Sequence, residues 1–126
     1  MSSRAEKEFV SYVVELLQPM GAVVAKSMFG GFGVFIDGLM FGLIAESVLY
    51  LKVDKQTETD YTGRGLEPFT YNKKGKVYKM AYYQAPEEAL EDGEELRKWA
   101  NDAYEVALRA RKNLYSPLIQ NTEYQW

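Results

Sequence analysis

The chain has 126 residues, of which 47% are apolar and 14% aromatic, enough for the core of one domain. It contains neither cysteine nor histidine, which excludes disulfides, thiolate or imidazole metal ligands, and catalysis by either side chain. The net charge of −3 disfavours avid nonspecific DNA binding, and no apolar run approaches the length of a membrane span. We therefore expect a cytoplasmic protein that does not enter a membrane.

The first half of the chain predicts a helix followed by strands. Apolar residues recur at helical spacing over residues 4–17, and Pro19 ends that helix because proline cannot extend the hydrogen-bond ladder. Residues 22–53 then change to strand-forming side chains and predict an antiparallel meander. Asp37–Gly38 is a strong hairpin signal, since both central positions of a type I′ turn need a positive φ, and Glu46–Ser47 predicts a second short turn.

A short helix and a second hairpin are expected next. Asp54 is suited to cap a helix that runs to about Tyr61, because its carboxylate can accept hydrogen bonds from free backbone N–H groups. Residues 67–71 and 76–83 then alternate in the manner of two strands joined by a turn at residues 72–75.

The chain closes with helical segments. Pro86 opens a helical turn, and a long helix is expected from about residue 93 to residue 112. Its apolar stripe should cover the sheet, with Trp99 largely buried there. The stripe consists of Leu96, Trp99, Ala100, Ala103, Ala107 and Ala110.

These elements predict one α+β domain over residues 1–112, followed by an irregular tail over residues 113–126. The expected order is α-βββ-α-ββ-α. An antiparallel sheet of about five strands, in two hairpin or meander units with helices packed on one face, is the simplest arrangement of that order.

The stretch MFGGFGVFIDG, residues 28–38, poses the question of whether its glycines hold a phosphate. A phosphate-binding loop lies between a strand and a helix, whose N-terminal N–H groups face the anion. Here the glycines precede strand-forming residues, so the pattern favours a structural interpretation. Gly30 and Gly31 are expected in a tight turn or bulge, and Gly33 and Gly42 are expected to leave room for neighbouring aromatic rings.

The best candidate for a binding surface is the second hairpin. Its lysines alternate with aromatic residues, an arrangement that could stack bases and hold phosphates. The alternative is a solvated hairpin tip whose lysines prevent edge-to-edge aggregation, and the acidic net charge favours it. The candidate contact residues are Lys73, Lys74, Lys76 and Lys79.

Other charged groups fit structural roles. The acidic block over residues 87–95 suits the start of a helix, where carboxylates interact favourably with the helix dipole, and it lacks the alternation of a calcium loop. Nothing in the sequence marks a pair of carboxylates for general acid–base catalysis. We therefore predict no catalytic residue, no metal site and no cofactor.

Four motifs in order give the sequence its most specific signature. They are MFGG-x-G, LYLK-x-D, PF-x-Y and M-x-YY-x-x-PEE, and together with LRKWA they extend over roughly residues 26–100. In this order they resemble the TfoX N-terminal domain family. The resemblance implies a bacterial protein with a compact α+β fold, without a cofactor or an assigned catalytic residue.

The same resemblance implies a role in gene regulation. Full-length members regulate natural competence genes and are thought to act with the cyclic-AMP receptor protein. They carry a second, helical domain, so this chain is expected to be either a stand-alone N-terminal domain or one domain of a longer protein. The predicted function is that of a non-enzymatic regulator acting through contacts with a protein of the transcription machinery. The alternative is direct, weak nucleic-acid binding through the hairpin at residues 72–79, and a homodimer is left open.

Overall fold

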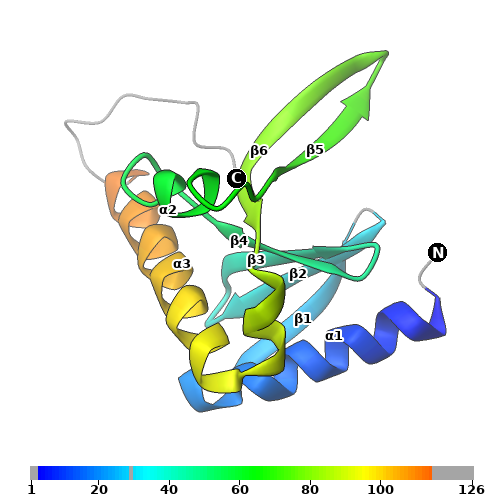
Figure 1. The fold of residues 1–126 in the computed structure, drawn as a ribbon, viewed down its shortest axis with the longest axis vertical. Helices are drawn as coiled ribbons and strands as arrows, with labels where there is room; N and C mark the ends of the chain where they lie inside the picture. Colours follow the sequence, from blue (N-terminus) through cyan, green and yellow to red (C-terminus); the bar gives the residue numbers. More distant parts are fainter. Residues whose placement is uncertain (1–2, 29, 115–126) are drawn as a thin grey trace.

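A computed structural model describes residues 3–28 and 30–114. Its strands form one sheet, and its longer helices lie together on one side of that sheet (Figure 1). The strands are β1 (Val23–Met28), β2 (Gly31–Ile36), β3 (Leu39–Ala45), β4 (Val48–Lys52), β5 (Pro68–Lys73) and β6 (Lys76–Gln84). The helices are α1 (Arg4–Leu17), α2 (Glu58–Thr62) and α3 (Gly93–Leu114), with 3₁₀ turns η1 (Gln18–Met20) and η2 (Glu87–Glu91).

The predicted α+β class and antiparallel sheet are confirmed. Strand order across the sheet is β1-β2-β3-β4-β6-β5, and every neighbouring pair is antiparallel. The sheet has six strands rather than about five. The additional strand is β1, which pairs with β2 from Val23 opposite Ile36 to Met28 opposite Gly31.

The hairpin turns follow from residues that tolerate a positive φ. Asp37 and Gly38 have φ angles of 51° and 77°, as the type I′ prediction requires. Glu46 and Ser47 have φ angles of 51° and 61°, so the second predicted turn is also present. Both turns connect neighbouring antiparallel strands and fix the meander from β2 to β4.

The core lies between the sheet and the two long helices. α3 packs on β3 and β4, and α1 packs on β1 and on α3. Small and medium side chains of α3, such as Leu96, Ala100 and Ala103, are almost completely buried, which lets the helix approach the strands closely. A register shift between Val34 and Phe35 belongs to the β2–β3 pairing, where the extra β3 residue Phe41 is fully buried in this core.

The glycines of the MFGG stretch have structural roles. Gly30 has a φ of +67°, and Gly31 begins strand β2, so a strand rather than a helix follows the turn. A Cβ on Gly31 would overlap the backbone oxygen of Ile44 on the neighbouring strand. At Gly33 a Cβ would come within 2.7 Å of the Phe35 ring, which confirms that this glycine leaves room for an aromatic side chain.

Gly42 differs from the expectation. Its Cβ would contact Val34 at 3.2 Å, so the space that it leaves is filled by an aliphatic rather than an aromatic side chain. The two residues lie opposite each other on β2 and β3. The glycine therefore accommodates a buried cross-strand neighbour.

The helices match their predicted positions with small changes at the ends. Asp54 accepts hydrogen bonds from the backbone N–H groups of Gln56 and Thr57, at 3.0 and 3.2 Å, so it caps a turn, and α2 itself begins at Glu58. The last helix extends to Leu114, two residues further than expected, and the remaining part of the predicted tail lies outside the described residues. Within the described part of the chain, no helix is both long and apolar enough to cross a membrane.

Candidate functional site

The predicted contact residues lie on a hairpin that projects from the sheet. Only the end of β6, from Tyr82 to Gln84, pairs with β4, whereas the rest of the strand pairs with β5 alone. Figure 1 shows the outer part of β5 and β6 extending away from the helices and from the other strands. The tip turns at Lys74 and Gly75, whose φ angles are 54° and 78°. This ribbon is therefore accessible from both of its faces.

One face of the ribbon carries lysines next to stacked tyrosines. Lys73 lies opposite Lys76, and two positions further from the tip Tyr71 lies opposite Tyr78, so these side chains share a face. The tyrosine rings stack on each other with centroids 5.4 Å apart and planes inclined by 21°. With Lys74 in the turn, we call Lys73, Lys74 and Lys76 the tip lysines. The structure brings these three predicted residues together.

Lys79 is separated from the tip lysines. It lies opposite Thr70, on the other face of the ribbon, and its Nζ donates a hydrogen bond to Glu58 Oε2 at 3.3 Å. The same carboxylate oxygen accepts a hydrogen bond of 2.7 Å from the Tyr83 hydroxyl. The hydrogen bond from Tyr83 has the largest effect on the pKa of Glu58 and lowers it; burial opposes this, and the hydrogen bond and charge of Lys79 lower the pKa further. Lys79 therefore lies beside α2, on the other face of the ribbon from the tip lysines.

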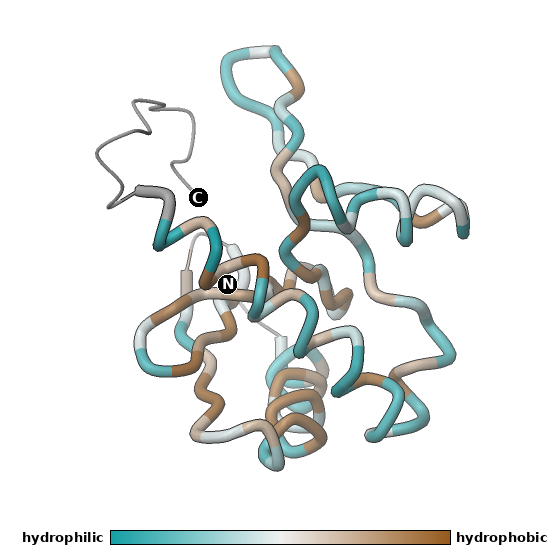
Figure 2. Tube along the Cα trace, turned by 90° about the vertical axis from the view of Figure 1, so that its left-hand side faces the viewer, coloured by the Kyte–Doolittle hydropathy of each residue, from teal (hydrophilic) through white to brown (hydrophobic). Residues whose placement is uncertain are grey.

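The hairpin also exposes the apolar residue Val77, which the sequence pattern did not mark. Val77 is 66% exposed, and Tyr71 and Tyr78 are each 40% exposed. Figure 2 shows the projecting hairpin as mainly hydrophilic, with a hydrophobic position on one side. Valine in a strand is ordinarily taken as a core residue, so only the projection of the ribbon shows that Val77 faces solvent.

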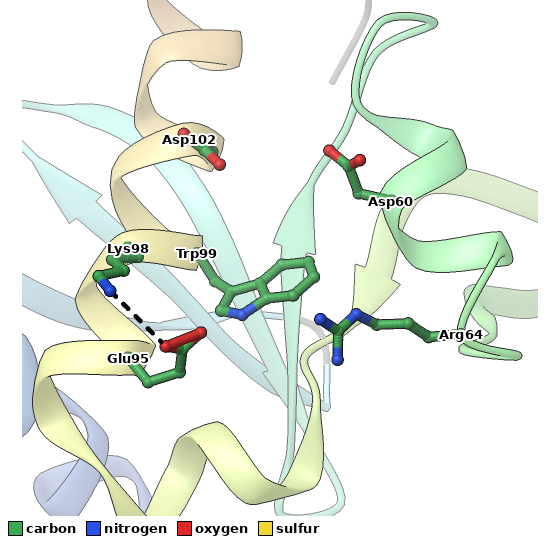
Figure 3. Close-up of a pocket in the computed structure, with 6 residues that line it drawn as sticks. All are labelled: Asp60, Arg64, Glu95, Lys98, Trp99 and Asp102. Carbon is green, nitrogen blue, oxygen red and sulfur yellow. Dashed lines mark ion pairs between the residues drawn. The ribbon is translucent and has the colours of Figure 1, made fainter.

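A second concave feature lies between α2 and α3. The cleft has a volume of about 310 Å³, and Figure 3 shows Asp60 and Arg64 on one side of it and side chains of α3 on the other. The α3 residues that line it are Glu95, Lys98, Trp99 and Asp102.

Trp99 is placed differently from the prediction. It is only partly buried, because one side of its ring lines the cleft instead of facing the sheet. Tyr61 of α2 meets the indole edge-to-face, with centroids 5.0 Å apart and planes at 69°. Arg64 lies over the same indole, with its Cζ 5.0 Å from the ring centroid. The expectation of a largely buried tryptophan was wrong because the indole lines the cleft and contacts Tyr61 and Arg64, an arrangement that the sequence does not reveal.

Some charged side chains of the cleft form ion pairs and others do not. Lys98 Nζ lies 3.9 Å from Glu95 Oε1, and a terminal nitrogen of Arg64 lies 3.5 Å from Glu88 Oε2 on η2. Neither Asp60 nor Asp102 forms an ion pair or a side-chain hydrogen bond with the described residues. The pKa of Asp102 is raised, first by burial and then by the negative charges of Asp60 and Glu105, while the positive charge of Arg109 opposes the shift.

An ion pair fixes α3 against the segment before α2. Arg109 donates hydrogen bonds from Nε and from one terminal nitrogen to Asp54 Oδ2, at 3.1 and 2.8 Å. Burial alone would raise the pKa of Asp54, but Arg109 and the backbone N–H groups of Gln56 and Thr57 together lower it. The sequence does not indicate that Arg109 pairs with Asp54, because pairing between distant segments has no local signal.

Comparison with known proteins identifies the family. The TfoX N-terminal domain matches residues 15–107, a range that includes the β5–β6 hairpin and the α2–α3 cleft. The chain belongs to the TfoX N-terminal domain family. The family resemblance predicted from the sequence motifs is thus confirmed.

Two curated relatives of this TfoX-family chain carry names. It is 29% identical over 85 residues to DNA transformation protein TfoX1 of Aliivibrio fischeri, covering 68% of this chain and 39% of that protein. It is 23% identical over 97 residues to Protein Sxy of Escherichia coli K12, covering 77% of this chain and 46% of that protein. The chain therefore matches less than half the length of either relative.

Proposed function

We propose that this protein is a non-enzymatic regulator that acts by contacting another protein through the β5–β6 hairpin. The observation that carries this proposal is the exposure of Tyr71, Val77 and Tyr78 on a projecting ribbon. Exposed tyrosines are typical of the centres of protein interfaces, whereas lysines are typical of their rims. The tip lysines flank the tyrosine pair on its tip side, and Val77 is exposed on the opposite face of the ribbon.

The tyrosine geometry favours a protein over a nucleic acid. A base stacks on the open face of an aromatic ring, but Tyr71 and Tyr78 cover one face of each other. Lys79 is held by Glu58, so three tip lysines remain for phosphates rather than four. The net charge of −3 further weakens the attraction of a polyanion.

The biological setting of the proposal comes from the family. One relative is named as a DNA transformation protein, and we extend that setting to this chain. The protein would act in the bacterial cytoplasm in the regulation of competence genes. Its partner would be a component of the transcription machinery, with the cyclic-AMP receptor protein as the candidate suggested by the family resemblance.

Site-specific photocrosslinking in the bacterium that naturally makes the protein tests this proposal. A photoreactive phenylalanine replaces Tyr71 in the full chain, and a second variant carries it at the exposed residue Glu87 as a control. The proposal predicts one discrete crosslinked protein from position 71 that is absent from position 87 and is identified by mass spectrometry. No crosslink from position 71, or the same products from both positions, would contradict it.

The second candidate function is direct binding of nucleic acid by the tip lysines. It is supported by their location on one face with the tyrosines. In the crosslinking experiment this function would produce nuclease-sensitive adducts in place of a protein adduct. A crosslink between two copies of the chain would instead identify the hairpin as a dimer contact.

A further inference from the structure

The α2–α3 cleft has the chemistry of a receptor for a planar cation. Asp60 and Asp102 face each other across it, from α2 and α3 respectively (Figure 3). Neither carboxylate is neutralised by an ion pair with the described residues, and their repulsion contributes to the raised pKa of Asp102. A cation placed between them would relieve this repulsion and gain two charge-assisted contacts.

The contact between Arg64 and Trp99 shows that this indole can pack against a guanidinium group. Its Cζ lies 5.0 Å from the centroid of Trp99, within the distance at which a cation is attracted to the ring. The Arg64 guanidinium forms an ion pair with Glu88 on η2 rather than with Asp60 or Asp102. Trp99 makes an edge-to-face contact with Tyr61. The cleft thus places an indole, over which Arg64 lies, beside two carboxylates that form no ion pair with the described residues.

The volume of the cleft and the placement of its carboxylates favour a guanidinium over other cations. A volume of about 310 Å³ is near the lower limit of small-molecule sites, which suits a single side chain better than a nucleotide. Two carboxylates on opposite walls match the planar fork of a guanidinium, which can bond to both and lie flat near the indole. An ammonium group is a compact point charge and cannot satisfy the two walls in the same way.

We propose that the cleft lined by Asp60, Trp99 and Asp102 binds the guanidinium of an arginine side chain in a peptide segment of a partner protein. This site is distinct from the hairpin and does not depend on the function proposed for the hairpin. It would give the protein a second contact point, at which the partner is recognised by one exposed arginine.

Binding is tested with the full chain and N-acetyl-arginine amide as the probe. Titration is followed by the NMR shift of the Trp99 indole N–H and by calorimetry, and the neutral isostere N-acetyl-citrulline amide and the lysine analogue are titrated in parallel. We expect binding of the arginine compound, at least several-fold weaker binding of the lysine compound, and no binding of citrulline. Free arginine, which carries its own carboxylate, should bind more weakly than the capped amide, which distinguishes a peptide segment from the free amino acid.

Paired variants separate the cleft from general electrostatic attraction. Asp60→Asn/Asp102→Asn should weaken binding at least about tenfold, because both guanidinium contacts are lost. The control Glu87→Gln/Glu91→Gln removes the same charge from an exposed segment outside the cleft and should change affinity less than about twofold. Circular dichroism verifies folding, and the single variant Asp60→Asn serves if the double variant unfolds. Equal weakening by both pairs, or no shift of the Trp99 signal with the arginine compound, would overturn the proposal.

Discussion

Replacing each of two adjacent glycines by alanine should destabilise the protein to very different extents. Gly30 has a left-handed φ of +67°, but a Cβ there would meet nothing within 4 Å. An alanine in that conformation costs about 1–2 kcal/mol, partly offset by about 0.4–1 kcal/mol from the restricted unfolded chain. We therefore expect Gly30→Ala to lower the free energy of unfolding by about 0–1.6 kcal/mol.

Gly31→Ala should cost considerably more. Its Cβ would overlap the backbone oxygen of Ile44, which cannot rotate away as a side chain could, so β2 and β3 must separate locally. Overpacking costs about 1–3 kcal/mol and each weakened backbone hydrogen bond about 1 kcal/mol, which together suggest a loss of about 2–4 kcal/mol. For a domain of this size, that loss corresponds to a decrease in Tm of about 10 °C.

Urea denaturation followed by circular dichroism measures both variants against the wild-type protein. The expected order of stability is wild type, then Gly30→Ala, then Gly31→Ala. If Gly31→Ala were as stable as Gly30→Ala, the close approach of β2 to β3 would not explain this glycine, and the structural interpretation of the MFGG stretch would be refuted.

Three further predictions concern the ion pair, the long helix and the tip lysines. The folded-state pKa of Asp54 is lowered, so its stabilising contribution is present above its ordinary value of 3.8 and is lost as pH falls through the folded pKa; Arg109→Gln should therefore destabilise at pH 7 more than at pH 3 in urea titrations. Leu96→Ala should cost about 3–4 kcal/mol but Trp99→Ala only about 2 kcal/mol, because the indole partly faces the cleft; calorimetric unfolding giving the reverse order would contradict this. If duplex DNA binds through the three tip lysines alone, a plot of log K against log salt concentration should have a slope of about −2.7, because each phosphate contact contributes about −0.9. Binding would then weaken about 40-fold between 50 and 200 mM salt. A markedly steeper slope in a mobility-shift titration would show that further basic residues contact the DNA.

Local sequence signals predicted the elements of the fold well. Asp37–Gly38 and Glu46–Ser47 determine their turns through backbone conformations that few residues tolerate, so these hairpins could be identified without any tertiary information. The period of the long helix likewise identified Leu96 as a core residue. β1 lies within the meander predicted for residues 22–53, but its separate pairing with β2 depends on a partner strand further along the chain.

The candidate sites were predicted less completely because they depend on contacts between distant segments. Lys79 resembles the tip lysines in sequence, and only the strand register places it on the opposite face beside Glu58. Val77 could not be distinguished from a core valine, because the projection of the ribbon beyond β4 is a property of the whole sheet. The α2–α3 cleft has no motif, since two of its carboxylates, Asp60 and Asp102, lie 42 positions apart in the sequence.

The most direct test of the account measures the affinity of the partner captured at position 71 for purified variants of the full chain. The account predicts that Tyr78→Ala weakens binding at least about tenfold, as truncation of an interface anchor does, while Lys73→Gln/Lys76→Gln has a smaller effect. It also predicts that binding resists nuclease treatment. Affinity that depends mainly on the lysines, falls steeply with salt and disappears with nuclease would contradict the account and assign the hairpin to nucleic acid.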